Sequence, residues 1–197
     1  MYKYLNFPQQ LSIDPSAYHH EENLFSRGEI NWILDSVENI PYQPGTVTGD
    51  HSISSIRKSN IKWLSWMDNP EFEWVYNRLQ QSIERANNKY WDFNLYSMPE
   101  HIQYTEYYDD GGHYDWHMDM GAGVLSARKV SITVQLSDPN EYEGGNLQFM
   151  RGEFQEDAPR GLGTVIVFPS YMLHRVSEIT KGTRKSLVLW VGGEHFK

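Results

Sequence analysis

Two side chains that can bind a metal ion stand two positions apart in the segment Tyr104–Met120, YTEYYDDGGHYDWHMDM. They are His117 and Asp119, and in an extended chain residues two apart project to the same side. An imidazole and a carboxylate on one face can hold a metal ion, but they need a third ligand. His174, in FPSYMLHRV, is the best candidate because that segment also has the pattern of a strand.

Two histidines and one carboxylate on one face of an octahedron leave three positions open, which is typical of non-haem Fe(II) sites. His-x-Asp alone is a weak signal, since most such histidines are ordinary hydrogen-bonded residues. Asp115 shares the side of His117 as well, so alternation does not decide between Asp115 and Asp119. A zinc hydrolase, or a metal-binding protein without activity, could use the same ligands.

Two further predicted strands carry polar faces that point to an enzyme. Alternation in the segment RKSLVLW puts four residues on one face: Arg184, Ser186, Val188 and Trp190. A guanidinium is a planar fork that binds a carboxylate through two hydrogen bonds. The segment VSITVQL likewise has a polar face, made of Ser131, Thr133 and Gln135. Such a face is costly inside a protein unless it lines a polar site, and a simple metal binder needs no anchor like Arg184.

The elements that position these residues are predicted as helices first and strands afterwards. Ser26 and Glu29 form a capping-box pattern before a helix over about 27–38. A strand over 60–67 precedes a second helix, which begins with Asp68 or Asn69 as its cap, has Pro70 in its first turn and ends near residues 87–88. From about residue 91 the apolar period is two, and the candidate strands are 91–97, 100–108, 113–119, 129–136, 146–150, 164–168, 172–177 and 184–191.

Short strands separated by regular turns are typical of an antiparallel sandwich or barrel, the jelly roll included. We expect a mainly β fold in which the N-terminal helices flank one sheet. A single domain is predicted over 1–197, with the helices and flanking strands in 1–95 and the jelly-roll catalytic core in 96–197. The connections 45–59 and 152–163 are candidate lids, because long connections in compact domains are usually functional.

Composition restricts the function. The formal net charge of −9 weighs against a nucleic-acid binder, although basic residues cluster at 57–58 and 181–185. The chain has no cysteine, which excludes disulfides and thiolate catalysis. The first residues show no secretory signal, and no apolar run is long enough to span a membrane. A cytoplasmic protein is therefore the default expectation.

A YxxGxxYxxHxD-like spacing, followed by YEGGNL, GTVIVFPS, HRV and GTRKSLVLW, resembles the Fe(II)/2-oxoglutarate-dependent dioxygenases of the prolyl 4-hydroxylase type. The likeness runs over about 103–190, nearly half of the chain. It implies a double-stranded β-helix (jelly-roll) core and Fe(II) bound by His117, Asp119 and His174, and so it selects Asp119 over Asp115. The related halogenases have a small residue in place of the carboxylate, so Asp119 favours hydroxylation.

The resemblance also implies a site for 2-oxoglutarate. The distal carboxylate of this cosubstrate would pair with Arg184, beside Ser186, where the collagen-modifying branch often has lysine. Tyr108 stands where the family has a tyrosine that contacts 2-oxoglutarate, and Tyr107 would serve if the loop is shifted by one residue. Gln135 matches a second contact. Three further candidates for the substrate pocket are Tyr104, Tyr114 and Trp190.

The implied reaction is hydroxylation of an unactivated C–H bond, coupled to decarboxylation of 2-oxoglutarate to succinate and CO₂. O₂ is the second cosubstrate, and ascorbate is a further candidate cofactor. The leading substrate is C4 of a prolyl residue in a peptide or protein, with a free amino acid or another small molecule as the alternative. A nucleic-acid dealkylase would use the same metal site but needs a basic, aromatic rim. Trp63, Trp66 and Arg57 could form a peptide groove, although both tryptophans are expected in the core.

Overall fold

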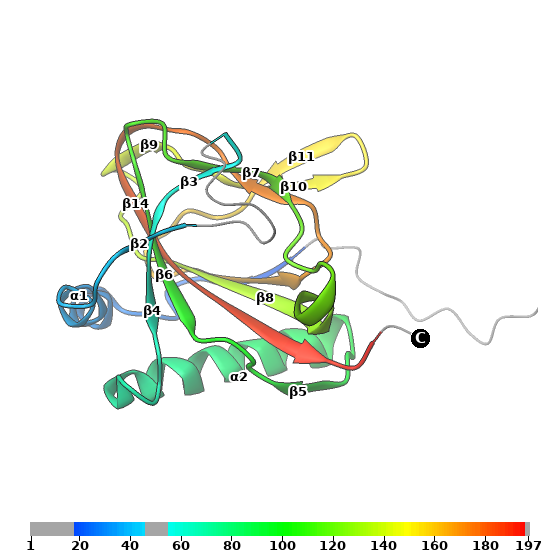
Figure 1. Ribbon diagram of the computed structural model, residues 1–197. Helices are drawn as coiled ribbons and strands as arrows, with labels where there is room; N and C mark the ends of the chain where they lie inside the picture. Colours follow the sequence, from blue (N-terminus) through cyan, green and yellow to red (C-terminus); the bar gives the residue numbers. More distant parts are fainter. Residues whose placement is uncertain (1–17, 46–54, 196–197) are drawn as a thin grey trace, which may run out of the picture.

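Two antiparallel sheets face each other in the computed structural model, which describes residues 18–45 and 55–195 (Figure 1). The larger sheet has nine strands: β1 (His19–Glu21), β2 (Gln43–Pro44), β4 (Asn60–Leu64), β5 (Leu95–Ser97), β6 (Ile102–Tyr108), β8 (Arg128–Gln135), β9 (Tyr142–Gly144), β12 (Val165–Pro169) and β14 (Ile179–Gly193). The smaller sheet has five: β3 (Arg57–Lys58), β7 (His113–His117), β10 (Leu147–Arg151), β11 (Phe154–Asp157) and β13 (His174–Val176). The described residues are thus mainly β.

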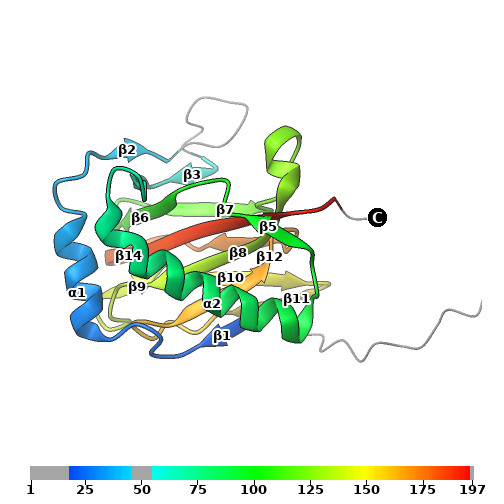
Figure 2. The same ribbon diagram turned by 90° about the horizontal axis from the view of Figure 1, so that it is seen from below.

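The helices cover the larger sheet on the side away from the smaller one, and Figure 2 shows α2 crossing it. They are α1 (Arg27–Ser36) and α2 (Glu73–Tyr90), with 3-10 turns η1 (Pro70–Phe72) and η2 (Gly123–Ala127). Apolar residues of α1 and α2 share one buried cluster with alternate residues of β8 and β14, among them Ile33, Leu79, Ile132 and Leu189. Because strand side chains alternate, the intervening polar residues of these strands face the smaller sheet.

Local signals placed the first helix well. The predicted capping box is present, because Ser26 accepts a hydrogen bond from the backbone of Glu29 while the Glu29 carboxylate accepts one from the Ser26 backbone at 2.9 Å. The second helix continues to Tyr90, beyond the predicted end. The Asn87 side chain lies in its last turn and hydrogen-bonds both backbone groups of Phe93. As a result, the strand predicted over 91–97 is reduced to β5.

Strand β14 is longer than the predicted strand 184–191, because it begins at Ile179 and continues through Gly182. Gly182 has a φ of +72°, and an added Cβ would lie 2.2 Å from the carbonyl oxygen of Glu141. The glycine therefore permits a close approach to β9 within a continuous strand. The short strands β1, β9 and β11 were not predicted, since three or four residues are too few to show alternation.

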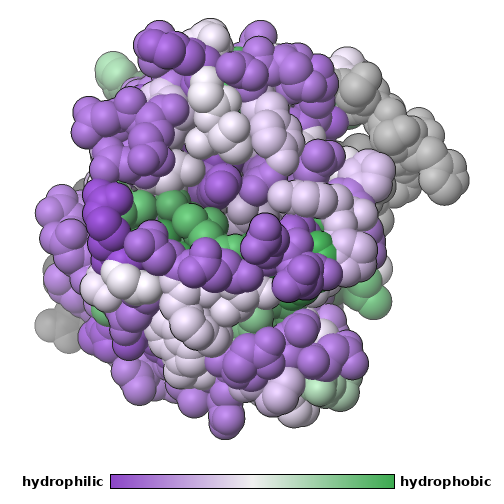
Figure 3. Space-filling view, turned by 90° about the vertical axis from the view of Figure 1, so that its left-hand side faces the viewer, coloured by the Kyte–Doolittle hydropathy of each residue, from purple (hydrophilic) through white to green (hydrophobic). Residues whose placement is uncertain are grey.

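The face of the molecule seen in Figure 3 is mainly hydrophilic, with hydrophobic side chains visible in a hollow across it. This agrees with the charged composition of the chain. Among the described residues, none of the helices is long and apolar enough to cross a membrane.

A buried carboxylate on β6 forms the Glu106 cluster, in which Glu106 accepts hydrogen bonds from the hydroxyls of Tyr42, Tyr104 and Tyr108. Burial alone would raise the pKa of Glu106, but these hydrogen bonds and the nearby Lys185 ammonium lower it below its usual value. A carboxylate whose pKa is lower in the folded than in the unfolded state stabilises the fold above the unfolded pKa. That contribution is lost as the pH falls through the folded pKa.

We therefore expect Glu106→Gln to lower the free energy of unfolding at pH 7 by about 2 kcal/mol, because hydrogen bonds to a charged group are lost. The difference from the wild type should begin to shrink as the pH falls below the unfolded value of about 4.3. It should disappear once the pH is below the lowered pKa of Glu106 in the folded state. Urea unfolding between pH 7 and pH 3 measures it, with Glu84→Gln on the exposed side of α2 as the control. If the difference in unfolding free energy between the wild type and Glu106→Gln does not change with pH, Glu106 is not a carboxylate whose charge stabilises the fold.

Candidate metal centre

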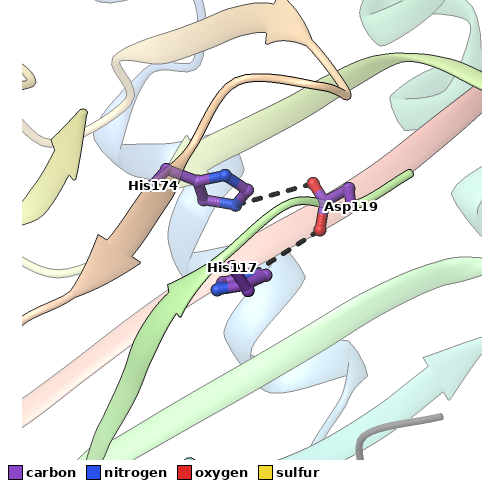
Figure 4. A group of neighbouring side chains, drawn as sticks. All are labelled: His117, Asp119 and His174. Atoms are coloured by element: carbon purple, nitrogen blue, oxygen red, sulfur yellow. Dashed lines mark ion pairs between the residues drawn. The ribbon is translucent and has the colours of Figure 1, made fainter. Parts of the chain in front are cut away.

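The three predicted ligands come together at one end of the smaller sheet (Figure 4). His117 ends β7 and lies directly opposite His174, the first residue of β13. Asp119 follows β7, and its backbone N–H donates to the carbonyl of Ser170 at 3.0 Å. One ligand atom from each of the three side chains lies within 4.8 Å of the others. Asp115, the open alternative, is exposed and is not part of this group.

Both histidines are held with Nε2 toward the carboxylate. Nδ1 of His117 lies 2.7 Å from the carbonyl of Asp115, and Nδ1 of His174 lies 2.8 Å from the carbonyl of Met172. A carbonyl only accepts, so each Nδ1 carries the hydrogen and each neutral ring has a lone pair on Nε2. The Nε2 atoms lie 3.6 Å from Oδ1 and Oδ2 of Asp119, respectively. Two imidazole nitrogens and a carboxylate oxygen are a donor set that fits Fe(II).

The protonation states suit metal binding. Burial alone would raise the pKa of Asp119, but the neighbouring His174 and His117 and a hydrogen bond from Ser131 lower it well below its usual value. Burial lowers the pKa of His174 to about 4. At neutral pH the carboxylate is therefore charged and His174 is neutral, which are the forms that ligate metals.

The three residues line a cavity of about 670 Å³ between the two sheets. The cavity extends along the polar faces of β6 and β14, where Tyr107 pairs with Arg184 and Thr105 with Ser186. All four residues of β14 that alternation assigned to one face line it: Arg184, Ser186, Val188 and Trp190. The sheet pairing thus places the predicted anion anchor in the same cavity as the metal-ligand group.

Arg184 is a buried cation with no carboxylate partner among the described residues. Its side chain is one of the largest that are fully buried, and its residue is 1% exposed. Its Nη2 donates to Oε1 of Gln135 at 2.9 Å and its Nη1 to Oγ of Ser186 at 3.4 Å, whereas its Nε has no hydrogen-bond partner in this part of the chain. A buried, unbalanced guanidinium is costly unless an anion binds to it. The cavity therefore fits an anionic ligand.

Two of the tyrosines proposed for the cavity lie elsewhere. Tyr104 is buried in the core under the helices, and both Tyr104 and Tyr108 donate to Glu106. Neither lines the cavity, whereas Tyr107 does, with its ring centroid 5.7 Å from the Arg184 guanidinium carbon. The family position that favoured Tyr108 does not hold in this cavity, since Tyr104 and Tyr108 share the face of β6 opposite to that of Tyr107. Tyr107, the alternative, is the tyrosine placed to contact a ligand of Arg184.

Gln135 also has a different place from the one expected. Its Oε1 accepts from Arg184, and its Nε2 donates to the carbonyl of Pro159 at 3.1 Å. It does not line the cavity. Gln135 therefore holds the guanidinium in position, in place of the expected direct contact with a ligand.

Aromatic residues form the walls near the metal-ligand group. Tyr114 stacks on the ring of His117 with centroids 3.5 Å apart, and the Arg57 guanidinium carbon lies 4.7 Å from the centroid of the Tyr114 ring. Trp63 and Trp190 both line the cavity, with ring centroids 6.4 Å apart. The expectation that Trp63 and Trp66 are core residues was wrong, since Trp63 faces the cavity and Trp66 is 56% exposed.

Arg128 is a cavity residue that the sequence did not reveal. It forms an ion pair with Glu100, lies 3.9 Å above the Trp190 ring and donates from Nη1 to the carbonyl of Asp119 at 3.1 Å. Strict alternation along β8 would place Arg128 on the apolar face with Val130 and Ile132. Arg128 lines the cavity instead, because the pairing of β8 with β14 shifts register next to it. A bulge of this kind has no signal in a single sequence.

The two candidate lids have different outcomes. Residues 46–54 of the first lie outside the described residues, while Arg57, near its end, lines the cavity. Residues 152–163 comprise the turn between β10 and β11, strand β11 itself and the residues that follow it. None of them lines the cavity. The second segment is therefore not a lid over this site.

Comparison with known proteins agrees with this site. Residues 102–192 match the family model of the 2OG-Fe(II) oxygenase superfamily. A PKHD-type hydroxylase of Gluconobacter oxydans is 28% identical over 179 residues, which is 87% of this chain and 76% of the relative. Another, from Rippkaea orientalis, is 27% identical over 174 residues, or 85% and 75% of the two chains.

Solved structures share the fold. A prolyl hydroxylase of Trichoplax adhaerens, in complex with a peptide fragment of the hypoxia inducible factor oxygen degradation domain, superposes with a TM-score of 0.76 at 16% identity and covers 91% of this chain and 84% of its own. A prolyl-4-hydroxylase of Pseudomonas putida gives 0.66 at 16% identity, covering 91% and 94%. His117, Asp119 and His174 all lie inside the residues that match the 2OG-Fe(II) oxygenase model, so the chain resembles this superfamily over the segment that holds its metal-ligand group.

Proposed function

We propose that the chain hydroxylates a prolyl residue of a peptide or protein, at C4, with Fe(II), 2-oxoglutarate and O₂. The observation that carries this proposal is the buried Arg184, which lacks a carboxylate partner among the described residues and shares a cavity with the metal-ligand group. The proposal includes a double-stranded β-helix for the two facing sheets. A single domain over 1–197, a need for ascorbate and a cytoplasmic location stay predictions.

The proposed roles follow from the contacts. His117, Asp119 and His174 would hold Fe(II), each histidine through the Nε2 that faces the carboxylate. Arg184 would bind the distal carboxylate of 2-oxoglutarate, since Gln135 and Ser186 already orient its guanidinium. Bound together, iron, 2-oxoglutarate and O₂ supply the oxidation, in which 2-oxoglutarate becomes succinate and CO₂ while a C–H bond becomes C–OH.

The walls of the cavity support a prolyl substrate. Tyr114, Trp63 and Trp190 present aromatic surface beside the metal-ligand group, which suits an apolar ring and excludes water from the reacting atoms. The similar proteins reported above include prolyl hydroxylases, one of them in complex with a peptide. A prolyl residue inside a peptide has no free amino or carboxyl group, so it needs no charged side chain to bind such a group. Aromatic walls are therefore enough to hold its ring.

The test begins without a substrate. Adding 2-oxoglutarate to the Fe(II)-loaded protein under anaerobic conditions should produce the weak visible charge-transfer band of chelated ferrous iron. A screen of proline-containing peptides against free proline then follows, with the gain of one oxygen measured by mass spectrometry. Absence of the band while iron is demonstrably bound would contradict the cosubstrate, and hydroxylation of free proline alone would contradict the peptide substrate.

A further inference from the structure

Asp119 is the one member of the metal-ligand group with two equivalent ligand atoms. A carboxylate can bind a metal through one oxygen or through both, and binding through both occupies an extra coordination position. Oδ1 lies 3.6 Å from Nε2 of His117, and Oδ2 lies 3.6 Å from Nε2 of His174. These equal distances do not decide which oxygen binds the metal.

A buried serine distinguishes the two oxygens. Ser131, on the polar face of β8, is 0% exposed, and its hydroxyl donates to Oδ2 of Asp119 at 2.6 Å. An O–H to carboxylate hydrogen bond of this length is a strong, charge-assisted one. It engages part of the charge and one lone-pair direction of Oδ2, whereas Oδ1 faces Nε2 of His117, itself a ligand atom, at 3.6 Å.

A second buried serine orients the first. The hydroxyl oxygens of Ser131 and Ser170 lie 3.0 Å apart, and Ser170 is also 0% exposed. Because the single hydrogen of Ser131 goes to the carboxylate, Ser170 must be the donor between the two hydroxyls. The Ser170 carbonyl accepts from the backbone N–H groups of Asp119 and Met120, each at 3.0 Å. Ser170 therefore holds the Asp119 segment through its backbone and, through Ser131, the carboxylate itself.

We propose that Ser131, oriented by Ser170, is a positioning residue that restrains Asp119 to bind the metal through Oδ1 alone. The consequence is a metal with three protein atoms and three open positions, the number that a two-oxygen cosubstrate and O₂ require together. Without the serine, the carboxylate can turn and bind through both oxygens, which leaves two open positions. This inference rests on the proposed function, because it takes the three residues as the metal site.

Mn(II) is a suitable probe, because water-proton relaxation at saturating metal reports the number of water molecules on the ion without any turnover. The wild type should retain three waters, and Ser131→Ala should lose about one of them. Ser170→Ala should shift the count in the same direction by a smaller amount, since Ser131 is kept but loses its donor. Ser137→Ala is the matched control, because Ser137 is a buried serine beyond β8 whose hydroxyl donates to the Thr183 carbonyl, away from the metal-ligand group.

A second measurement separates the inference from general loss of structure. Chelation of 2-oxoglutarate uses two open positions, so the Mn(II) protein saturated with 2-oxoglutarate should retain one water in the wild type and about none in Ser131→Ala. Ser137→Ala should retain one water, like the wild type. If Ser131→Ala does not fold, the water count of Ser170→Ala decides.

The outcomes are distinct. A water count equal to that of the wild type in both Ser131→Ala and Ser170→Ala would overturn this inference and leave the proposed function intact. Wild-type protein that binds neither Mn(II) nor Fe(II) would overturn the proposed function, and with it this inference. A lower count in Ser131→Ala, with an unchanged count in Ser137→Ala, supports both.

Discussion

Asp119→Ala should abolish metal retention and 2-oxoglutarate turnover together. The carboxylate is 8% exposed and lies between the Nε2 atoms of both histidines, so its removal deletes the only anionic member of the metal-ligand group. We expect the affinity for Fe(II) to fall by more than the ~10–100-fold that the loss of a partner of a metal ligand typically costs. Anaerobic calorimetry measures the metal affinity, and succinate formation measures the turnover.

Asp115→Ala is the matched control for this prediction. The side chain of Asp115 is exposed and, among the described residues, accepts a hydrogen bond from the backbone of Trp116 alone, at 2.8 Å. His117 is held by the Asp115 carbonyl, which alanine retains. Metal affinity and turnover should therefore stay at wild-type values. Equal losses in the two variants, or normal metal binding by Asp119→Ala, would show that Asp119 is not a ligand. Circular dichroism verifies that both variants are folded.

Arg184→Ala should raise the 2-oxoglutarate concentration needed for half-maximal turnover by about 100–1,000-fold while leaving Fe(II) affinity unchanged. The expected loss corresponds to about 3–4 kcal/mol, the value of two charge-assisted hydrogen bonds. The physical reason is that the cavity holds the guanidinium buried and without a carboxylate partner among the described residues, so an anionic ligand meets a preformed donor pair. Arg184→Lys should lose less, because it keeps the charge but not the fork.

Pyruvate provides a control for the same prediction, because it has the 2-oxo acid group of 2-oxoglutarate without the distal carboxylate. The wild-type protein should bind pyruvate far more weakly than 2-oxoglutarate, and Arg184→Ala should bind the two with similar affinity. Anaerobic titration of the Fe(II) protein measures both ligands. If Arg184→Ala still binds 2-oxoglutarate much more tightly than pyruvate, the distal carboxylate binds to a residue other than Arg184. Loss of Fe(II) binding in this variant would show that the substitution disturbs the metal centre.

The alternation of side chains made much of the cavity readable from the sequence. A strand backbone forces residues two apart to one side, so spacing alone groups Arg184, Ser186, Val188 and Trp190, and all four line the cavity. The same rule selected the polar face of β8, which contains Ser131 and Gln135. The likeness to a known family then singled out His117, Asp119 and His174, which the structure places within reach of one ion.

Alternation does not say which face of a strand meets the cavity. On β6 the tyrosines 104, 107 and 108 are all compatible with a pocket, and only the pairing of Tyr107 with Arg184 shows that the odd-numbered residues face it. Trp63 was misplaced for a similar reason, because an aromatic residue on a strand fits a core as well as a cavity wall. The register shift beside Arg128 likewise comes from the pairing with β14.

The sequence by itself determined the helix start at Ser26, most of the long strands and, through the family likeness, the three metal-ligating candidates, because these depend on local spacing. Only the tertiary structure decided which tyrosine accompanies Arg184, that Gln135 holds that guanidinium, and that Ser131 and Ser170 hold Asp119. These contacts join residues from different strands, and their geometry depends on sheet register and on how the two sheets face each other. Neither is encoded in the spacing of residues along one strand.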